Sequence, residues 1–319
     1  MDYTKIIKEI GRGKNHARDL DRQTAFELYQ AMLAGEVPEL ELGGILIALR
    51  IKGEAEEEML GFYQAMQQQV LPLQAPQGRP LPVVLPSYNG ARKQANLTPL
   101  LALLLAKVGL PVVVHGVLDD STRVTSAEIF RALGLPWSEQ AVHAQQRLDN
   151  GEAVFMPVST LSAPLARQLG LRWRMGVRNS AHTLAKLATP FGEQDALRLA
   201  SVSHPEYVGR VASFFRQIGA RGLLMHGTEG EAYANPLRCP QIHYIAGGEQ
   251  RVLLERTLQD ETPTLPAAKD AETTARWIER CLAGEVAIPQ AIQRQGGCFL
   301  GAAGESETLE QGLQRLRQA

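Results

Sequence analysis

The sequence has 319 residues, 45% of them hydrophobic and 21% charged, and its formal net charge is −1 at pH 7. This length and composition allow one large domain with a substantial core plus a small domain, and the balanced charge excludes a bulk polycation. No apolar run is long enough to cross a bilayer, and residues 1–20 are a charged stretch without a secretory hydrophobic region, so no membrane attachment is expected. Cys239, Cys281 and Cys298 have neither disulfide nor metal-ligand spacing, which predicts packing residues in a reducing cytoplasm.

The first 70 residues predict a small helical domain. Residues 4–69 form successive amphipathic stretches that are interrupted at 35–38 and at Gly53. Acidic residues within 54–58 place negative charge at a helix N-terminus, where it is stabilising.

An early turn in this domain carries the basic residues Arg12, Lys14 and Arg18. They either form a loop that grips phosphates or belong to an ordinary charged surface with Asp19 and Asp21 nearby. We favour the ordinary surface and keep the three cations as candidates for binding nucleic acid.

A proline-rich connector at residues 71–86 precedes alternating strands and helices. Short apolar runs predict strands at residues 82–85, 112–114, 153–157, 197–202, 222–225 and 241–245. Such strands, separated by helical stretches, indicate a largely parallel sheet that is covered on both faces. Residues 71–319 are therefore expected to form an α/β domain.

Residues 82–116 predict a strand, a polar loop, an apolar helix and a second strand. A loop at the carboxyl end of such a strand is a ready anion site, usually lined by glycine. Here it has one glycine, the bulky Tyr88 and the adjacent cations Arg92 and Lys93. Because proline donates no N–H and Tyr88 occupies volume, we expect side-chain charge to replace backbone amides as the anion-binding group. Arg92 and Lys93 are candidate ligand-binding residues on this argument.

Asn96 and Thr98 lie at the start of the predicted helix. They either hydrogen-bond a phosphate there or cap the helix N-terminus, and we favour capping.

Four motifs carry a family resemblance: residues 33–66 with their A-L-R-x-K-G pattern, Asn96-Leu97-Thr98, His115-Gly116 and the run 226–236. With them the chain resembles the anthranilate phosphoribosyltransferase and pyrimidine nucleoside phosphorylase superfamily (glycosyltransferase family 3 fold), most closely its YbiB-like branch. The resemblance covers nearly the whole chain. It implies a helical domain of residues 1–70 with a contribution from about 170–190, an α/β domain of residues 71–319, and a homodimer.

The chain departs from that family at its phosphate- and metal-binding motifs. The family's G-T-G-G-D loop aligns with residues 86–90, and its K-H-G-N-R-S segment aligns with residues 114–119, where the Lys, Asn and Arg are missing. Its H-G-x-D-G-L-D-E run aligns with residues 226–233, so that its acidic metal pair becomes Ala232 and Tyr233. Two positions without a carboxylate predict the loss of Mg²⁺-assisted transfer, and Glu229 or Glu231 is the remaining candidate for a substitute ligand.

The resemblance therefore implies a vestigial phosphate pocket. Its residues are Ser87, Asn89, Gly90, Asn96, Thr98, His115 and Gly116. We assign no catalytic residue, no metal and no cofactor.

The second candidate site lies in the basic part of the chain. Residues 166–221 carry nine basic and three acidic residues, an excess of six, which leaves −7 for the remainder of a chain of net charge −1. Within it, residues 172–182 place arginines around Trp173, which suits pairing with phosphates and stacking on bases. The alternative is a helix edge whose arginines pair with glutamates of the N-terminal helices. By the resemblance, the first of these arginines falls where the family binds the carboxylate of its acceptor. The candidate residues are Arg172, Arg174, Arg178 and Lys186.

Two functions from different classes remain. The first is a homodimer that binds single- or double-stranded nucleic acid with little sequence preference, on a phosphoribosyltransferase fold that has lost its donor and metal sites. The YbiB-like branch implies this function, since it is associated with basic grooves and nucleic-acid binding. The alternative is a phosphoribosyltransferase or phosphorylase that acts on a phosphoribosyl or nucleoside substrate. A third, weaker possibility is a structural partner protein that uses the acidic N-terminal helices.

Overall fold

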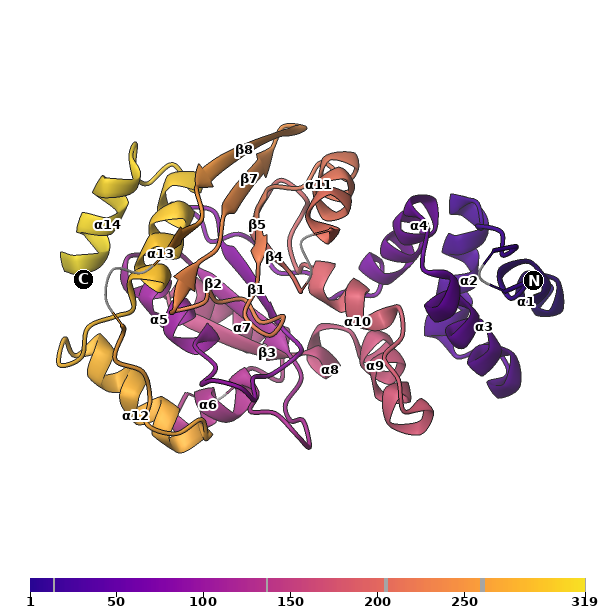
Figure 1. Cartoon of the computed structure of the whole chain (residues 1–319), viewed down its shortest axis with the longest axis horizontal. Coiled ribbons are helices and arrows are strands. Elements are labelled where there is room, and N and C mark those ends of the chain that lie inside the picture. The colour runs from indigo at the N-terminus through magenta and orange to yellow at the C-terminus, as the bar shows by residue number, and fades with distance from the viewer. Residues whose placement is uncertain (14, 136, 204–205, 259–261, 319) are drawn as a thin grey trace. The chain divides into compact units, whose positions relative to one another are not determined.

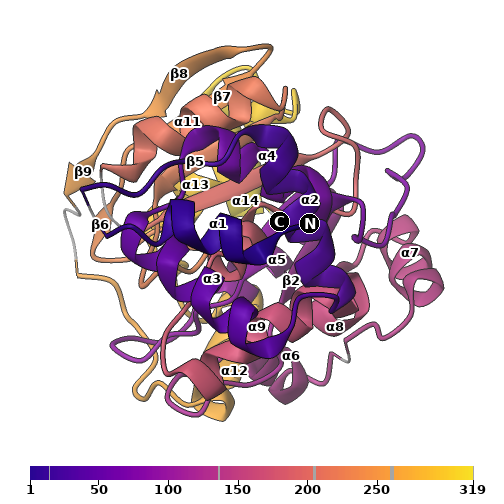
Figure 2. The ribbon, with the colours of Figure 1, turned by 90° about the vertical axis from the view of Figure 1, so that its right-hand side faces the viewer.

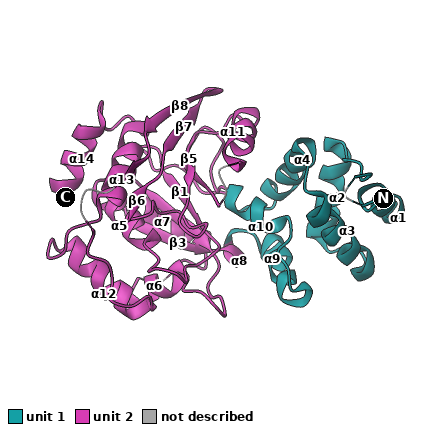
Figure 3. Cartoon of the chain, viewed as in Figure 1, with its two compact units in different colours: residues 1–71, 161–188 teal, residues 72–160, 189–319 magenta. Residues whose placement is uncertain are grey.

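The computed structural model describes residues 1–319 except 14, 136, 204–205, 259–261 and 319. The chain divides into two compact units (Figure 3). Unit 1 consists of Met1–Leu71 and Leu161–Ala188, and unit 2 consists of Pro72–Thr160 and Thr189–Ala319. The chain therefore leaves unit 1 and returns to it once.

Unit 1 is helical. Its elements are α1 (Tyr3–Ile10), α2 (Arg22–Ala34), α3 (Glu39–Lys52), α4 (Glu56–Gln67), α9 (Ala163–Met175), α10 (Ala181–Leu184) and the 3₁₀ turn η1 (Ala185–Leu187). α1 packs against α3, and α2 packs against α4 (Figures 1 and 2). The Asp2 and Asp21 side chains cap α1 and α2, because each accepts a hydrogen bond from the backbone N–H three residues later. Gly35 ends α2 in the left-handed conformation, with φ of 77°.

A buried ion pair joins α3 to α4. Glu58 is fully buried, and its carboxylate accepts hydrogen bonds from the backbone N–H of Leu20 at 2.9 Å and of Ala55 at 2.7 Å. Lys52 Nζ lies 2.7 Å from the Glu58 carboxylate and 2.6 Å from that of Asp19. A buried charge is stable only when it is paired and hydrogen-bonded, and Glu58 has both kinds of partner.

Unit 2 contains a seven-stranded sheet in the order β3-β2-β1-β4-β5-β7-β8. Its strands are β1 (Val83–Ser87), β2 (Val112–Gly116), β3 (Ala153–Pro157), β4 (Leu197–Val202), β5 (Gly222–His226), β7 (Ile242–Ala246) and β8 (Glu249–Leu254). Strands β1 to β5 pair in parallel, and β7 and β8 form an antiparallel edge. Every residue of β1, β2, β3 and β4 is buried, which is why their sequences are almost uninterrupted apolar runs. A separate short pair consists of β6 (Arg238–Cys239) and β9 (Thr257–Leu258).

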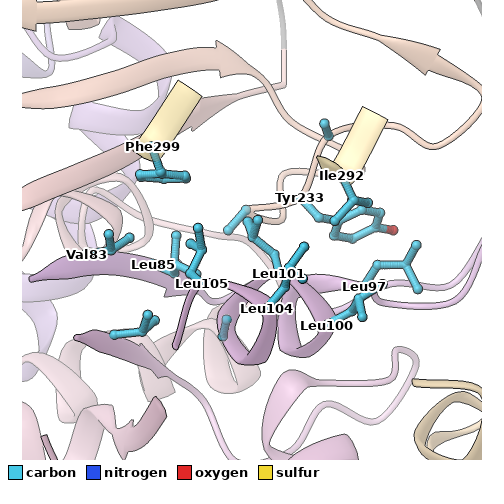
Figure 4. Packing of buried hydrophobic residues seen from close by; sticks show 14 of the residues in the cluster. Val83, Leu85, Leu97, Leu100, Leu101, Leu104, Leu105, Tyr233, Ile292 and Phe299 are labelled. Carbon is cyan, nitrogen blue, oxygen red and sulfur yellow. The ribbon is translucent and has the colours of Figure 1, made fainter. Parts of the chain in front are cut away.

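Helices cover both faces of this sheet. The helices of unit 2 are α5 (Thr98–Lys107), α6 (Ser126–Ala132), α7 (Ala141–Asp149), α8 (Val158–Leu161, which ends in unit 1), α11 (Tyr207–Gln217), α12 (Ala271–Leu282), α13 (Gln290–Ala302) and α14 (Leu309–Gln318). α5, α6, α12 and α13 share one core with alternate residues of the strands. Figure 4 shows Leu105 of α5 beside Leu85 of β1 in this core. Arg198 of β4 lies on the opposite face, where its guanidinium is 5.7 Å from the Phe215 ring of α11.

The predicted fold class is confirmed, and all six predicted strands form. β8 was not predicted, because its exposed first residues, Glu249–Arg251, interrupt the apolar pattern that marks a buried strand. A correction concerns Pro86 and Ser87, which belong to β1 and not to the loop that follows it. Since β1 pairs with β4 only through Val83 and Val84, Pro86 lies where the strand has a single neighbour and its missing N–H is tolerated.

Among the described residues, no helix combines the length and the apolar content that spanning a bilayer requires.

Candidate functional site

The loop between β1 and α5 is the first candidate site. It lies at the carboxyl end of β1, which has β2 on one side and β4 on the other. Gly90 has a φ of 64°, and a Cβ added there would lie 2.9 Å from the Arg123 Cβ, so the tight path of the loop requires glycine. The end of β2 approaches even more closely, because a Cβ on Gly116 would lie 1.8 Å from the Ser87 carbonyl oxygen.

Glu231 fills the centre of this loop with its carboxylate. The residue is fully buried, and its Oε1 accepts hydrogen bonds from the backbone N–H groups of Asn89 and Gly90, both at 2.8 Å. Its Oε2 accepts hydrogen bonds from Ser87 Oγ at 2.6 Å and Thr98 Oγ1 at 3.2 Å. Four neutral donors from the strand end, the loop and the first residue of α5 therefore converge on one carboxylate.

Glu229 occupies the outer part of the same loop. Its carboxylate accepts hydrogen bonds from the backbone N–H groups of Arg92, Lys93 and Gln94 at 2.8 to 3.3 Å. Arg123 Nη1 lies 3.8 Å from Glu229 Oε2. In the described part of the chain, Glu229 alone among non-glycine residues has a positive φ, 54°. A left-handed glutamate is uncommon, so the surrounding contacts must hold this turn in place.

The expectation that side-chain charge replaces the loop's backbone amides is wrong. The amides of five loop residues still point inward, and the two carboxylates accept their hydrogen bonds. The side chains of Arg92 and Lys93 are exposed. Tyr88 does not block the loop either, because its ring is buried and its hydroxyl lies 2.7 Å from His115 Nδ1.

The favoured capping prediction holds only for Asn96, because the Thr98 hydroxyl donates to Glu231 and does not cap α5. The Asn96 side-chain oxygen accepts a hydrogen bond from the Thr98 backbone N–H at 3.1 Å, at the start of α5. The Asn96 amide group donates to Ser126 Oγ at 3.2 Å, and Ser126 Oγ lies 2.7 Å from Ser87 Oγ. The structure thus connects Asn96 and Thr98 to the same hydrogen-bond network that surrounds Glu231.

The residues that align with the family's acidic metal pair do not fit Mg²⁺. Ala232 and Tyr233 are fully buried, and the Tyr233 hydroxyl donates to the Ala95 carbonyl oxygen at 3.0 Å. Burial, and then the nearby Glu231 and Glu229, raises the pKa of Tyr233 well above its usual value, so its oxygen stays protonated. Both glutamates already accept loop hydrogen bonds, and Mg²⁺ requires carboxylate or other oxygens free to complete near-octahedral geometry. Among the residues that the structure describes, no three His, Cys, Asp or Glu side chains gather as a metal-ligating group.

The second candidate site is a cluster of cations around His182 in α10, which we call the α9 basic cluster: Arg172, Arg178 and Lys186. Burial, and then the charges of these three residues, lowers the pKa of His182 to about 3. The Arg50 guanidinium of α3 contacts the backbone of this segment, because its Nη1 donates to the Arg178 carbonyl oxygen at 2.9 Å.

Trp173 lies beside this cluster. Its side chain is 58% exposed, and the Arg172 guanidinium carbon lies 4.3 Å from the centre of its ring. A guanidinium stacked on an exposed indole is a typical cation–π pair.

The remaining predicted cations have carboxylate partners or lie elsewhere. Arg174 forms a two-bond ion pair with Glu39 of α3 at 3.1 and 3.3 Å, which is the alternative that the sequence left open. Arg12 and Arg18 both contact Glu9, at 2.6 and 3.5 Å, and Glu9 was not the expected partner. Lys14 lies outside the described residues.

The basic excess of residues 166–221 is divided between the units. Unit 1 receives residues 161–188, which contain five basic and no acidic residues. In unit 2, Arg198 is 3% exposed and pairs with Glu193, so it belongs to the interior of the sheet and not to a binding surface. Arg92 and Lys93 also belong to unit 2, whereas the α9 basic cluster belongs to unit 1.

Sequence reasoning missed the role of Glu231 and the contribution of Arg50. A signal for Glu231 was present, because the aligned position of the family run is leucine, and a charged residue in an apolar position requires buried partners. Arg50 had no local signal, since its contact with the Arg178 carbonyl joins residues 128 positions apart in the sequence.

Comparisons with known proteins agree with this architecture. A family model described as "Glycosyl transferase family, helical bundle domain" matches residues 4–70, and one described as "Glycosyl transferase family, a/b domain" matches residues 89–319. The chain is 64% identical over 319 residues to the uncharacterized protein YbiB of Escherichia coli (strain K12), with 100% of both chains covered. It is 30% identical over 309 residues to the anthranilate phosphoribosyltransferase of Thermus thermophilus, with 94% of this chain and 90% of that one covered.

Solved structures give the same result. The crystal structure of anthranilate phosphoribosyltransferase (TrpD) from Thermus thermophilus matches with a TM-score of 0.78 at 26% identity, over 100% of this chain and 94% of that one. The Saccharomyces cerevisiae enzyme, in complex with PRPP and Mg, matches with a TM-score of 0.76 over 99% and 92% of the two chains, and its 13% identity shows a shared fold alone. The chain therefore belongs to the glycosyl transferase family, as a YbiB-like member of the superfamily that contains the anthranilate phosphoribosyltransferases.

Proposed function

We propose that this chain binds nucleic acid with little sequence preference through the α9 basic cluster. The observation that carries the proposal is the local excess of positive charge, since residues 161–188 contain five basic and no acidic residues, and Arg172, Arg178 and Lys186 all act electrostatically on the half-buried His182. Cations concentrated in one segment repel one another, and phosphate groups relieve that repulsion while releasing counterions. A chain of net charge −1 is able to bind a polyanion in this way because the positive charge is local.

Trp173 supports the same proposal. An exposed indole beside arginine provides a stacking surface for a base, and stacking tolerates any sequence because every base has an aromatic face. We therefore expect the cluster to contact phosphates and the tryptophan to contact bases.

We also propose that the protein is a homodimer. Leu40, Ile47 and Ile51 are 85%, 39% and 60% exposed, and their spacing of seven and eleven residues places them on one face of α3. An apolar stripe of this kind favours an interface, and a second copy of the chain offers a self-complementary partner.

The three cysteines support the predicted cytoplasmic location. All are buried and free of disulfides, and burial raises the pKa of Cys239 to about 11 and of Cys281 and Cys298 to about 12. Such thiols are inert packing groups, which is the ordinary state of cysteine in a reducing compartment.

Phosphoribosyl transfer is the second candidate, and the comparisons favour it over nucleic-acid binding. The Thermus thermophilus relative that is 30% identical over 94% of this chain is an anthranilate phosphoribosyltransferase. The β1–α5 loop argues against it, because the Glu231 carboxylate already accepts the hydrogen bonds of its backbone amides. Calorimetric titration with phosphoribosyl pyrophosphate and Mg²⁺ distinguishes the two functions. We expect no heat of binding, and micromolar affinity with turnover would establish the transferase.

The nucleic-acid proposal is tested by the salt dependence of binding. We expect fluorescence anisotropy with labelled single-stranded DNA of several unrelated sequences to show affinity that falls steeply with salt. Replacing the cluster with glutamines (Arg172→Gln, Arg178→Gln, Lys186→Gln) is expected to lower the slope of log K against log salt by about 2, from three lost contacts of ~0.7 each. The control carries three glutamines in unit 2, at the exposed Arg251, Arg276 and Arg280, and is expected to bind like the wild type. Equal decreases of the salt slope in the two triple variants would contradict the proposal.

His182 provides an independent readout of the same site. Its pKa is low partly because of Arg172, Arg178 and Lys186, so a bound phosphate that offsets their charge must raise it. NMR titration of the imidazole with and without an oligonucleotide measures this change directly. An unchanged pKa at saturating oligonucleotide would mean that binding occurs elsewhere.

A further inference from the structure

The turn after β5 presents two carboxylates to the β1–α5 loop. Residues 228–231 form it, and the Glu231 backbone N–H donates to the Thr228 carbonyl oxygen at 2.9 Å. Gly227 makes this approach possible, since a Cβ there would lie 2.5 Å from the Glu231 carbonyl oxygen. The side-chain amide of Asn89 donates to the Glu229 carbonyl oxygen at 2.7 Å, so the loop holds the turn as well as its carboxylates.

The donors around Glu231 match those that proteins use for oxyanions. Two consecutive backbone N–H groups, from Asn89 and Gly90, approach one oxygen, and two hydroxyls approach the other. Ser87 Oγ has a single proton, which it donates to Glu231, so Ser126 is the donor in its 2.7 Å contact with Ser87. This relay fixes the direction of every hydrogen bond toward the carboxylate.

The donors around Glu229 form a second set of the same type. Three consecutive backbone N–H groups, from Arg92, Lys93 and Gln94, converge on Oε1 of Glu229. Successive amides that point into one concavity are a typical anion-binding arrangement. Two negative groups, linked by one glycine, therefore occupy two adjacent anion positions of a single loop.

We propose that Glu229 and Glu231 are built-in anions that occupy an oxyanion-binding loop of this chain and close it to small phosphate compounds. Removing the Glu231 carboxylate converts the loop into a site for inorganic phosphate, held by the Asn89 and Gly90 amides and the Ser87 and Thr98 hydroxyls. In the wild type, an added phosphate meets a buried carboxylate that already accepts these hydrogen bonds. This proposal is independent of nucleic-acid binding, because it involves unit 2 and leaves the α9 basic cluster unchanged.

The test compares Glu231→Ala with the wild type by thermal unfolding in inorganic phosphate. Chloride at equal ionic strength serves as the reference, and acetate serves as a size match for the deleted carboxylate. We expect the variant to melt below the wild type in chloride. Above the Kd, we expect phosphate to raise its Tm by about 3–5 °C for each tenfold increase in concentration, because a ligand that binds only the folded state stabilises it by mass action.

Glu57→Ala is the matched control, since it removes an exposed carboxylate whose partner is Arg22. Its Tm and that of the wild type are expected to respond to phosphate no more than to chloride. A Glu231→Ala response no larger than the Glu57→Ala response would overturn the proposal, and so would phosphate binding to the wild type as tight as to the variant.

Glu229→Ala provides a second test of the proposal if Glu231→Ala does not fold. The Glu229 side chain is 10% exposed, and its loss frees the Arg92, Lys93 and Gln94 amides while Glu231 still fills the centre of the loop. We expect a phosphate-dependent Tm increase in this variant too, smaller than that of Glu231→Ala. The absence of a phosphate-dependent Tm increase in Glu229→Ala would by itself overturn the proposal.

Discussion

Glu58 shows what a single buried carboxylate contributes when every oxygen has a partner. Lys52 Nζ pairs with it at 2.7 Å, and two backbone N–H groups donate to it. Truncation would leave Lys52 in a site where its side chain is 6% exposed, with the exposed Asp19 as its remaining carboxylate. The consequence of a mutation therefore depends on the partners that are left behind.

We expect Glu58→Ala to lower the free energy of unfolding by about 3–5 kcal/mol, the usual cost of breaking a buried ion pair from one side. Glu57→Ala, one position earlier on α4, removes an exposed ion pair with Arg22 and is expected to cost less than about 1 kcal/mol. Chemical denaturation followed by circular dichroism measures both. Similar losses in the two variants would show that the buried pair does not stabilise unit 1.

At the scale of elements, the ends of β1 and β2 approach too closely for any side chain at Gly116. The register pairs Ser87 with Gly116, and an added Cβ would lie 1.8 Å from the Ser87 carbonyl oxygen. The same strand end carries the Ser87 hydroxyl that donates to Glu231. Glycine at this position therefore sets both the strand pairing and the geometry of the first candidate site.

Gly116→Ala is expected to destabilise unit 2 by at least about 1 kcal/mol, because the strand ends must separate to accommodate the methyl group. Gly170→Ala is the control, since Gly170 lies inside α9 with no atom within 4 Å of an added Cβ. There alanine is expected to stabilise by about 0.5–1 kcal/mol through helix propensity. Thermal unfolding of both variants shows whether each substitution lowers or raises the stability of the protein. A stabilising Gly116→Ala would refute the close approach of β1 and β2 at this position.

Elements were predictable where one physical signal dominated. The buried runs of β2 and β4 predict strands because parallel strands covered on both faces are apolar throughout. The antiparallel arrangement of β7 and β8 was not predictable, because a polar edge strand has a weak periodic signal and its direction depends on its neighbour.

At the scale of the whole molecule, the proposed dimer depends on the apolar stripe of α3. Leu40→Glu with Ile51→Glu places charge at two of its three exposed residues, and burying those charges in an interface is unfavourable. Light scattering after size exclusion is expected to give twice 34.9 kDa for the wild type and a single chain for the double variant. Val142→Glu on α7, at a residue that is 55% exposed, is the control and is expected to remain dimeric. A wild type that is monomeric at micromolar concentration would contradict the proposed homodimer.

The sequence by itself determined the helical bundle, the parallel α/β sheet and the superfamily, because periodicity, breaker residues and short motifs are local properties of the chain. It also indicated that Ala232 and Tyr233 are unable to bind a metal ion.

Only the tertiary structure decided which groups accept the hydrogen bonds of the β1–α5 loop. Glu231 and Asn89 are 142 residues apart and follow different strands of the sheet, so no local rule connects them. Folding brings their turns to the same end of the sheet, and there a buried carboxylate must find donors. The partners of the loop's amides, and the combined electrostatic effect of Arg172, Arg178 and Lys186 on His182, are therefore consequences of packing and not of sequence pattern.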